Sequence, residues 1–375
     1  MSGRRVEHTD VAEGLGYVRA VPEAPHPAPG HAGSRWARRD VLRVGLGLGL
    51  GAPLLGACTT SPTVLPGPET SAGGTTGPAG PTPGAATPAP APSVPATATG
   101  EQALSVRAAA ILDGPHRKDL GGDRTDLLRF LRDAHADHAV ALAGPDPTTR
   151  PTTAVPSPSA APPDVSGQSL AASLKALARA ESAQAAAQRR TATAASGLEA
   201  LVAGSLAVAS ETYAAALGAS RTPVVGRVRE HRPTPLLSDV EAAAALVAQL
   251  HAVVYGYQLA IGVLKYSSGA RRRAVGELAA ARRLLDAQIA FLLGRKADVP
   301  PAEPAYAPSP AVRSPADATR LVRGMQYRLA PFVGLTLAAA GSPAARTVAL
   351  TQLRSTVRTS VTWGAGLQVW PGWPD

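Results

Sequence analysis

The stretch V-A-Q-L-H-A-V-V-Y-G-Y-Q-L-A-I-G-V-L, from Val247 to Leu264, decides the fold class of this chain. Its large apolar residues recur at alternating intervals of three and four, which places them on one face of an α-helix. The stripe consists of Val247, Leu250, Val254, Tyr257, Ile261 and Leu264. A helix of this kind is stabilised mainly by packing its apolar face against other elements, so further helices are expected around it.

Seven more segments on either side of this stretch have helical composition and are separated by Pro- and Gly-rich breaks. No run of alternating apolar and polar residues predicts a strand, so the expected class is all-α. The predicted helices span residues 101–113, 123–142, 168–192, 196–217, 238–266, 270–293, 315–340 and 343–363.

The ends of several predicted helices carry capping residues. Ser238 with Glu241 three positions later forms a capping box, in which each side chain binds an open backbone N–H of the first turn. Ser314-Pro315 and Ser342-Pro343 place a cap before a proline at the first helical position. Gly294 occupies a position typical of a C-terminal cap.

Composition divides the chain into four regions. Residues 1–57 are predicted to be a signal region, and residues 58–100 a disordered tether. The tether consists mostly of Pro, Ala, Thr, Gly and Ser, which cannot bury enough apolar surface to offset the entropy of ordering. Residues 101–235 are predicted to form an N-terminal helical region resembling a bundle, and residues 236–375 a four-helix bundle. The sequence leaves open whether these two helical regions pack as one domain.

The predicted signal region ends at Cys58, the chain's one cysteine. Arg38 and Arg39 precede the apolar segment 44–55, and small residues follow it, which is the order of an export signal. Because a membrane-spanning helix needs about 20 apolar residues, this segment is too short to span. Cys58 resembles the lipidation residue of bacterial lipoproteins, which predicts a protein anchored to the outer face of the cell membrane. The arginine pair resembles the twin-arginine export motif, with Sec export as the alternative.

The C-terminal half contains the motifs H-A-V-V-Y-G-Y (251–257), A-R-R-L-L-D (281–286) and A-Y-A-P (305–308), followed by Trp363. On these residues it resembles the actinobacterial ferritin-like family DUF4439. Glu181 and the segment 201–217 resemble upstream regions of lipoproteins in the same group. The resemblance implies a four-helix ferritin-like fold of unassigned activity, and a shared fold does not by itself confer iron chemistry.

A ferritin-type di-iron site requires two Glu-x-x-His motifs, and the predicted helical regions, residues 101–375, contain none, so no cofactor is predicted and the di-iron site is incomplete. The better metal candidates are His135 and His138, which follow the helical stripe of Leu128 and Leu131 and could share zinc or copper. Alternatively, they are solvated or pair with Glu181 or Glu211. His251 is a further candidate ligand, although a hydrogen bond to a carbonyl or to a facing polar group is the favoured interpretation.

Charge and motifs exclude several functions. A lone cysteine excludes an intrachain disulfide, and no Gly-x-Ser-x-Gly motif indicates a serine nucleophile. The net charge is +10, but aromatic residues make up only 4% of the chain, which disfavours nucleic acid. A basic surface is expected to face either solvent alone or an anionic envelope component or protein partner. It comprises Arg271, Arg272, Arg273, Arg282 and Arg283.

The sequence therefore favours an anchored binding or structural module without catalysis. A cleft between the helical regions, lined by Tyr213, Tyr255 and Tyr257, is the predicted place for a small ligand or partner. The alternative is a metal-binding ferritin-like protein of the cell envelope, either an oxidase or a metal store.

Overall fold

The computed structural model describes residues 95–144, 146–149, 161, 163–165, 167–229, 232–304, 306, 308 and 311–374. These residues form eight α-helices, a single turn of 3-10 helix (η1, Arg117–Asp119) and no strand, which confirms the all-α prediction. The helices are α1 (Ala96–Asp113), α2 (Gly122–Ala143), α3 (Leu170–Ala194), α4 (Gly197–Gly218), α5 (Asp239–Val263), α6 (Gly269–Gly294), α7 (Pro315–Ala339) and α8 (Pro343–Thr362). Arg38, Arg39 and Cys58 lie outside the described residues.

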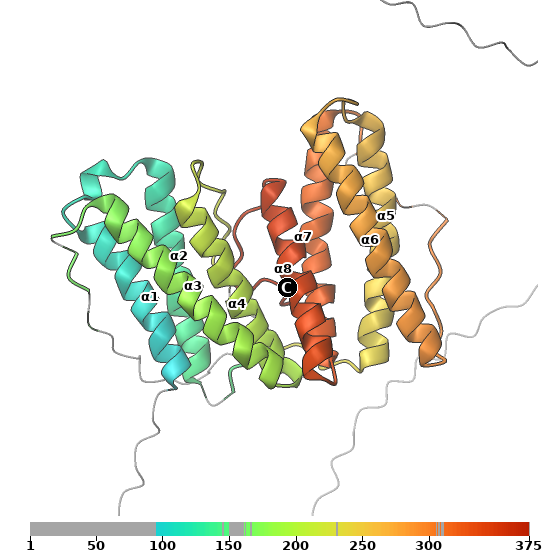
Figure 1. Cartoon of the computed structure of the whole chain (residues 1–375), viewed down its shortest axis with the longest axis horizontal. Coiled ribbons are helices and arrows are strands. Elements are labelled where there is room, and N and C mark those ends of the chain that lie inside the picture. Colours follow the sequence, from blue (N-terminus) through green and yellow to red (C-terminus); the bar gives the residue numbers. More distant parts are fainter. Residues whose placement is uncertain are drawn as a thin grey trace, which may run out of the picture. The chain divides into compact units, whose positions relative to one another are not determined.

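The helices form two groups within one compact unit (Figure 1). The first bundle contains α1–α4, and the second contains α5–α8. Each has a core of leucines and one fully buried tyrosine. The largest buried side chains of the first core are Leu127, Leu128, Leu131, Leu177, Leu201, Leu206 and Tyr213. Those of the second are Leu246, Leu250, Tyr257, Leu292 and Leu337.

Serine side chains begin five of the eight helices by accepting a backbone N–H of the first turn. Ser238 and Glu241 form the predicted capping box, and Ser314 and Ser342 cap the helices that start with proline. The prediction for Gly294 was wrong, because this residue is the last of α6 and the left-handed backbone conformation falls on Lys296, with φ 55°.

Helix α1 begins at Ala96, five residues before its predicted start. Residues 96–100 were assigned to the tether on composition, but Ala98 is fully buried against the first bundle. Local composition cannot show such a contact, because it depends on which distant residues cover the helix.

The two bundles touch along α4, which packs against α7 and α8. Gly204 of α4 permits close approach, since a Cβ there would overlap the Leu337 side chain. Glu211 of α4 also pairs with Arg189 of α3 and Arg354 of α8. Side chains from both bundles therefore hold this contact.

Residues 364–374, here called the C-terminal segment, leave α8 and cover part of the first bundle. The segment pairs with the loop after α4 through hydrogen bonds between Gly226 and Leu367 and between Leu367 and Val224. Gly334 of α7 permits its approach, because a Cβ there would overlap the Gly372 carbonyl oxygen. The last residues of the chain thus connect both bundles.

Helices α4 and α5 are long and apolar enough, by length and composition, to cross a membrane. In the fold, 78% of the most apolar window of α4 and 39% of that of α5 are buried inside the structure. A core helix of a soluble protein meets the same criteria, so the two helices are weak evidence for a membrane span.

Candidate metal centre in the first bundle

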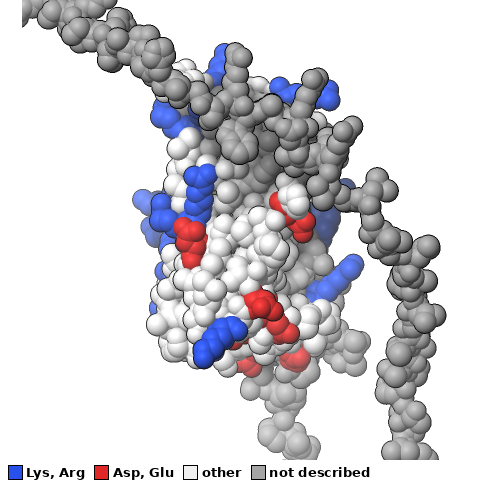
Figure 2. All heavy atoms as spheres, turned by 90° about the vertical axis from the view of Figure 1, so that its right-hand side faces the viewer, with Lys and Arg blue, Asp and Glu red and all other residues white. Residues whose placement is uncertain are grey.

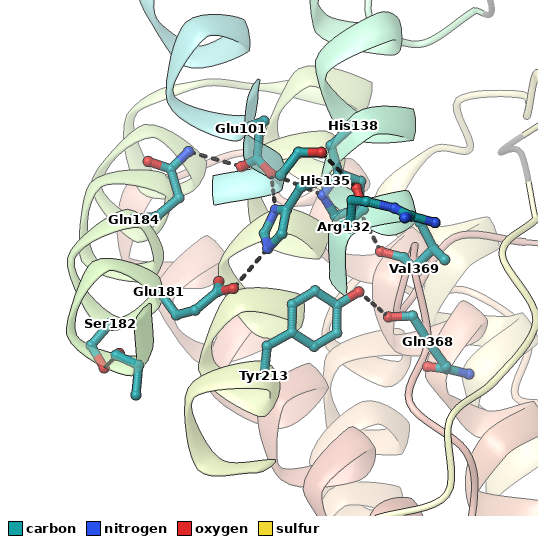
Figure 3. A network of polar contacts seen from close by, with 12 residues as sticks. Glu101, Arg132, His135, His138, Glu181, Ser182, Gln184, Tyr213, Gln368 and Val369 are labelled. Atoms are coloured by element: carbon teal, nitrogen blue, oxygen red, sulfur yellow. Dashed lines mark hydrogen bonds and ion pairs between the residues drawn. The ribbon is translucent and has the colours of Figure 1, made fainter. Parts of the chain in front are cut away.

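Four ionisable side chains meet inside the first bundle without contact with solvent (Figure 3). Glu101 comes from α1, His135 and His138 from α2, and Glu181 from α3. The two histidines are three residues apart, so they lie on one face of α2. Each carboxylate takes a position on the apolar stripe of its own helix, which directs it into the core rather than to the surface.

The Glu101 carboxylate is the centre of the cluster. Its Oε2 lies 2.7 Å from His135 Nδ1 and 3.0 Å from His138 Nδ1. These three candidate ligand atoms all fall within 4.8 Å of one another. The other carboxylate oxygen, Oε1, accepts a hydrogen bond of 2.8 Å from the Gln184 side chain, which fixes the orientation of the carboxylate.

The outer ring nitrogens of both histidines are also held. His135 Nε2 lies 2.7 Å from Glu181 Oε1, and His138 Nε2 lies 2.8 Å from the backbone carbonyl oxygen of Val369 in the C-terminal segment. Metal-binding histidines usually donate their second N–H to a carboxylate or a carbonyl in this way. The arrangement orients both Nδ1 atoms toward Glu101 Oε2 (Figure 3).

Counting protons shows that the cluster needs positive charge. Its four contacts each join an imidazole nitrogen to an oxygen of a carbonyl or a carboxylate. A neutral imidazole carries one N–H, so two neutral histidines supply protons for only two of these contacts. The other two contacts require two additional protons, or one divalent cation between Glu101 Oε2 and the two Nδ1 atoms. Either choice balances the charges of Glu101 and Glu181.

Electrostatics favours positive charge at the same place. Burial lowers the pKa of His135, but the charge of Glu181 and hydrogen bonds with Glu101 and Glu181 outweigh it and raise that pKa to about 10. Burial likewise raises the pKa of Glu101, but hydrogen bonds and charge interactions with His135 and His138 bring that pKa far below its ordinary value. Both carboxylates thus act to retain a cation.

One carboxylate oxygen of the cluster can still accept a hydrogen bond. Glu181 Oε2 is buried and has no hydrogen-bond partner among the described residues. A buried acceptor without a donor costs about 1–3 kcal/mol, so this oxygen favours a further donor or cation near Glu181.

The sequence-based alternatives for the histidines can now be compared with their positions. The interpretation that they are solvated is wrong, since both are fully buried. The pairing of His135 with Glu181 is confirmed, whereas Glu211 pairs with arginines. His251 lies in the second bundle and its Nε2 is 3.2 Å from the Pro300 carbonyl oxygen, as the favoured interpretation had it.

The three tyrosines predicted to line one cleft lie in separate surroundings. Tyr213 is buried in the first core, where its hydroxyl donates to the carbonyl oxygen of Gln368. Tyr257 is buried in the second core, and Tyr255 packs its ring against Tyr306. Tyrosines on α4 and α5 can belong to different cores because each helix turns its stripe toward its own bundle.

Two of the predicted surface arginines act within the fold. Arg271 donates to the carbonyl oxygens of Ile261 and Leu264 at the end of α5, and Arg272 donates to that of Ser267. Figure 2 shows the face beside α5 and α6, where Lys and Arg side chains are spread among uncharged residues, with Asp and Glu between them. Several of the Lys and Arg side chains gather along the left edge of this view.

Sequence reasoning missed Glu101 and assigned no role to Glu277. A signal for Glu101 was present, because it continues the buried stripe of Leu104, Ala108 and Ile111 at intervals of three and four. A lone carboxylate on an apolar stripe needs a partner, and the two histidines on the next helix supply it.

Together, the fold and the cluster define an all-α protein of two helical bundles with a buried histidine–carboxylate centre. Residues 242–375, which include the second bundle and the C-terminal segment, match the family model described as Domain of unknown function (DUF4439). A crystal structure of a conserved hypothetical protein from Mycobacterium tuberculosis is 26% identical, over 33% of this chain and 93% of that chain, with a TM-score of 0.32. No curated protein matches this sequence.

Proposed function

We propose that this protein binds one divalent transition-metal ion in its first bundle. The ligands would be Glu101 Oε2, His135 Nδ1 and His138 Nδ1. The observation that carries the proposal is the proton count, since three acceptor atoms converge while the outer nitrogens are held by Glu181 and the Val369 carbonyl oxygen. One divalent ion would replace two protons at unchanged net charge.

The donor set favours zinc or another ion that accepts imidazole nitrogen. Two nitrogens and one carboxylate oxygen suit Zn²⁺, whereas Mg²⁺ and Ca²⁺ prefer oxygen ligands alone. All four side chains of the cluster are fully buried, which fits metal holding or structural stabilisation better than catalysis on a substrate. We therefore propose that the protein is a metal-binding helical protein that holds its ion inside the fold.

Binding of Zn²⁺ to the metal-free protein tests the proposal. Calorimetry in buffers of different ionisation enthalpy should give one ion per chain and release of about two protons per ion near neutral pH, because ligands must lose their protons to bind. His138→Ala should weaken binding at least about tenfold. His251→Ala is the matched control, since His251 lies in the second bundle with its Nε2 on a loop carbonyl, and should leave binding unchanged.

Two results would overturn the metal proposal. Absence of Zn²⁺, Fe²⁺ and Mn²⁺ binding to the folded protein would reduce the cluster to a structural network that holds two additional protons. Equal affinity of His138→Ala and the unchanged protein would place any bound ion elsewhere.

We further propose that the protein acts outside the cell membrane, anchored through Cys58. Support comes from the paired arginines, the short apolar segment and the small residues that precede this cysteine. Twin-arginine export of a folded chain would allow the ion to be loaded in the cytoplasm, and a ferritin-like bundle is compatible with such cargo. Export of the folded chain would carry the bound ion with it, which is the physical reason to link the two proposals.

A further inference from the structure

The second bundle contains a cavity of about 330 Å³ that the proposed metal centre does not use. Helices α5, α6, α7 and α8 all contribute to its wall. Part of the lining is apolar, and the polar part includes one carboxylate. The lining includes Leu250, Tyr257, Glu277, Leu284, Gln326 and Leu329. An engineered cavity of about 150 Å³ accommodates benzene, so this one has room for a ring with a short polar arm.

The carboxylate in the cavity wall is held by two donors. Glu277 Oε2 accepts hydrogen bonds from the Tyr257 hydroxyl, at 2.9 Å, and from Trp363 Nε1, at 2.8 Å. The Gln326 side chain in turn donates to the Tyr257 hydroxyl, at 2.8 Å. Tyr257 is fully buried, and Gln326 is buried as well. Helices α5, α7 and the end of α8 thus fix one acidic group of α6 in a set position.

The second oxygen of this carboxylate remains available. The hydrogen bonds from Tyr257 and Trp363 both end on Glu277 Oε2, and Oε1 has no hydrogen-bond partner among the described residues. Burial raises the pKa of Glu277, against the hydrogen bonds from Tyr257 and Trp363 and the charge of Arg273. A partly desolvated carboxylate charge is stabilised by a cationic partner, because a close ion pair offsets the free-energy cost of desolvation.

We infer that this cavity binds a small organic cation, a primary ammonium carried on an apolar body. The ammonium donates to Glu277 Oε1, and the apolar body packs against Leu250, Leu284 and Leu329. Tyr257 cannot take the role of counter-ion, because burial and the charge of Glu277 raise its pKa far above the ordinary value and keep it neutral. Arg283 also lines the cavity and opposes positive charge there, so the ion pair with Glu277 has to outweigh this repulsion, which a single positive charge does more readily than two.

Calorimetric titration with phenethylammonium chloride tests this inference, with phenethyl alcohol as the neutral molecule of matching shape. The ammonium should bind, and the alcohol should bind about tenfold to hundredfold more weakly, because a hydrogen bond to a charged group stabilises by about 1.5–3 kcal/mol. Glu277→Gln keeps the size of the side chain and should weaken ammonium binding by a similar factor. Glu303→Gln, which removes an exposed carboxylate outside the cavity wall, is the matched control.

Three results would overturn the inference: no binding of the ammonium at millimolar concentration, equal binding of the alcohol, or unchanged binding by Glu277→Gln. The thermal midpoint of the Glu277→Gln variant shows whether it is folded. If it unfolds, Tyr257→Phe, which removes one donor to Glu277 and keeps the carboxylate, must still bind the ammonium better than the alcohol. Zinc binding in the first bundle is measured separately, so either proposal can fail alone.

Discussion

Replacing Glu101 with alanine tests the buried cluster most directly. The substitution removes one carboxylate and leaves three groups without their acceptor, namely His135 Nδ1, His138 Nδ1 and the Gln184 amide. Glu101 and both histidines are fully buried. Removing one partner of a buried ion pair costs about 3–5 kcal/mol, because the remaining charge stays buried and uncompensated. We therefore expect a loss of about 3–5 kcal/mol in the free energy of unfolding.

Urea denaturation measures this loss in free energy of unfolding. A chelator keeps the protein metal-free during the measurement. A chain of this size changes its thermal midpoint by about 2 °C per kcal/mol, so the expected decrease is about 6–10 °C. Asp113→Ala is the matched control, since Asp113 lies on the same helix and is exposed. Its effect should stay within about 0.5 kcal/mol.

The cost of Glu101→Ala should also depend on pH. The pKa of His135 is raised to about 10, so the stabilisation by its charged form is complete below the ordinary pKa of 6.5 and is lost as the pH rises through about 10. The pKa of Glu101 is lowered, so its contribution is present above the ordinary value of 4.5 and is lost as the pH falls through the lower folded-state value. The destabilisation should accordingly be larger at about pH 6 than at about pH 10.

The reasoning is refuted if Glu101→Ala costs no more than Asp113→Ala. A large cost that does not change with pH would contradict the assignment of charge to His135, and would leave only packing and neutral hydrogen bonds as the cause.

Two further predictions concern the anchor and the joint between the bundles. Cys58→Ser should move the protein from the membrane fraction to the soluble fraction of its native cell, and a variant that still fractionates with membranes would exclude lipidation at this residue. Gly334→Ala should destabilise the fold by about 1–3 kcal/mol, because its Cβ would overlap the Gly372 carbonyl oxygen. Gly276→Ala in α6, where a Cβ meets nothing within 4 Å, should instead stabilise it by up to about 1 kcal/mol. Equal melting shifts for the two glycine variants would show that the C-terminal segment does not pack on α7.

Much of the fold follows from local patterns. The stripe from Val247 to Leu264 predicts α5 because one apolar face needs a single period, and Ser238 marks its beginning by a cap that acts within one turn. The start of α1 was missed because Ala98 is buried by residues far along the chain. Local signals determine where a helix can begin, and tertiary contacts determine where it does.

The candidate site was predictable only in part, for a similar reason. His135 and His138 could be identified from one helix, since their spacing places them on the stripe of α2. Their partner Glu101 lies on another helix, and sequence spacing carries no information on which faces of two helices meet. The Val369 contact was beyond prediction altogether, because a backbone carbonyl has no sequence signature and lies 231 residues from His138.

The contact with Val369 links the proposed metal site to the C-terminal segment. The Val369 carbonyl oxygen can only accept, so it fixes the proton of His138 on Nε2 and leaves Nδ1 to face Glu101. Without the C-terminal segment, either nitrogen of His138 could carry the proton, and the need for a second positive charge beside Glu101 would vanish. The segment belongs to the part of the chain that matches the family model, whereas Glu101, His135 and His138 do not. Any metal-binding role is therefore a property of the first bundle together with the C-terminal segment, and relatives that share only residues 242–375 have no reason to share it.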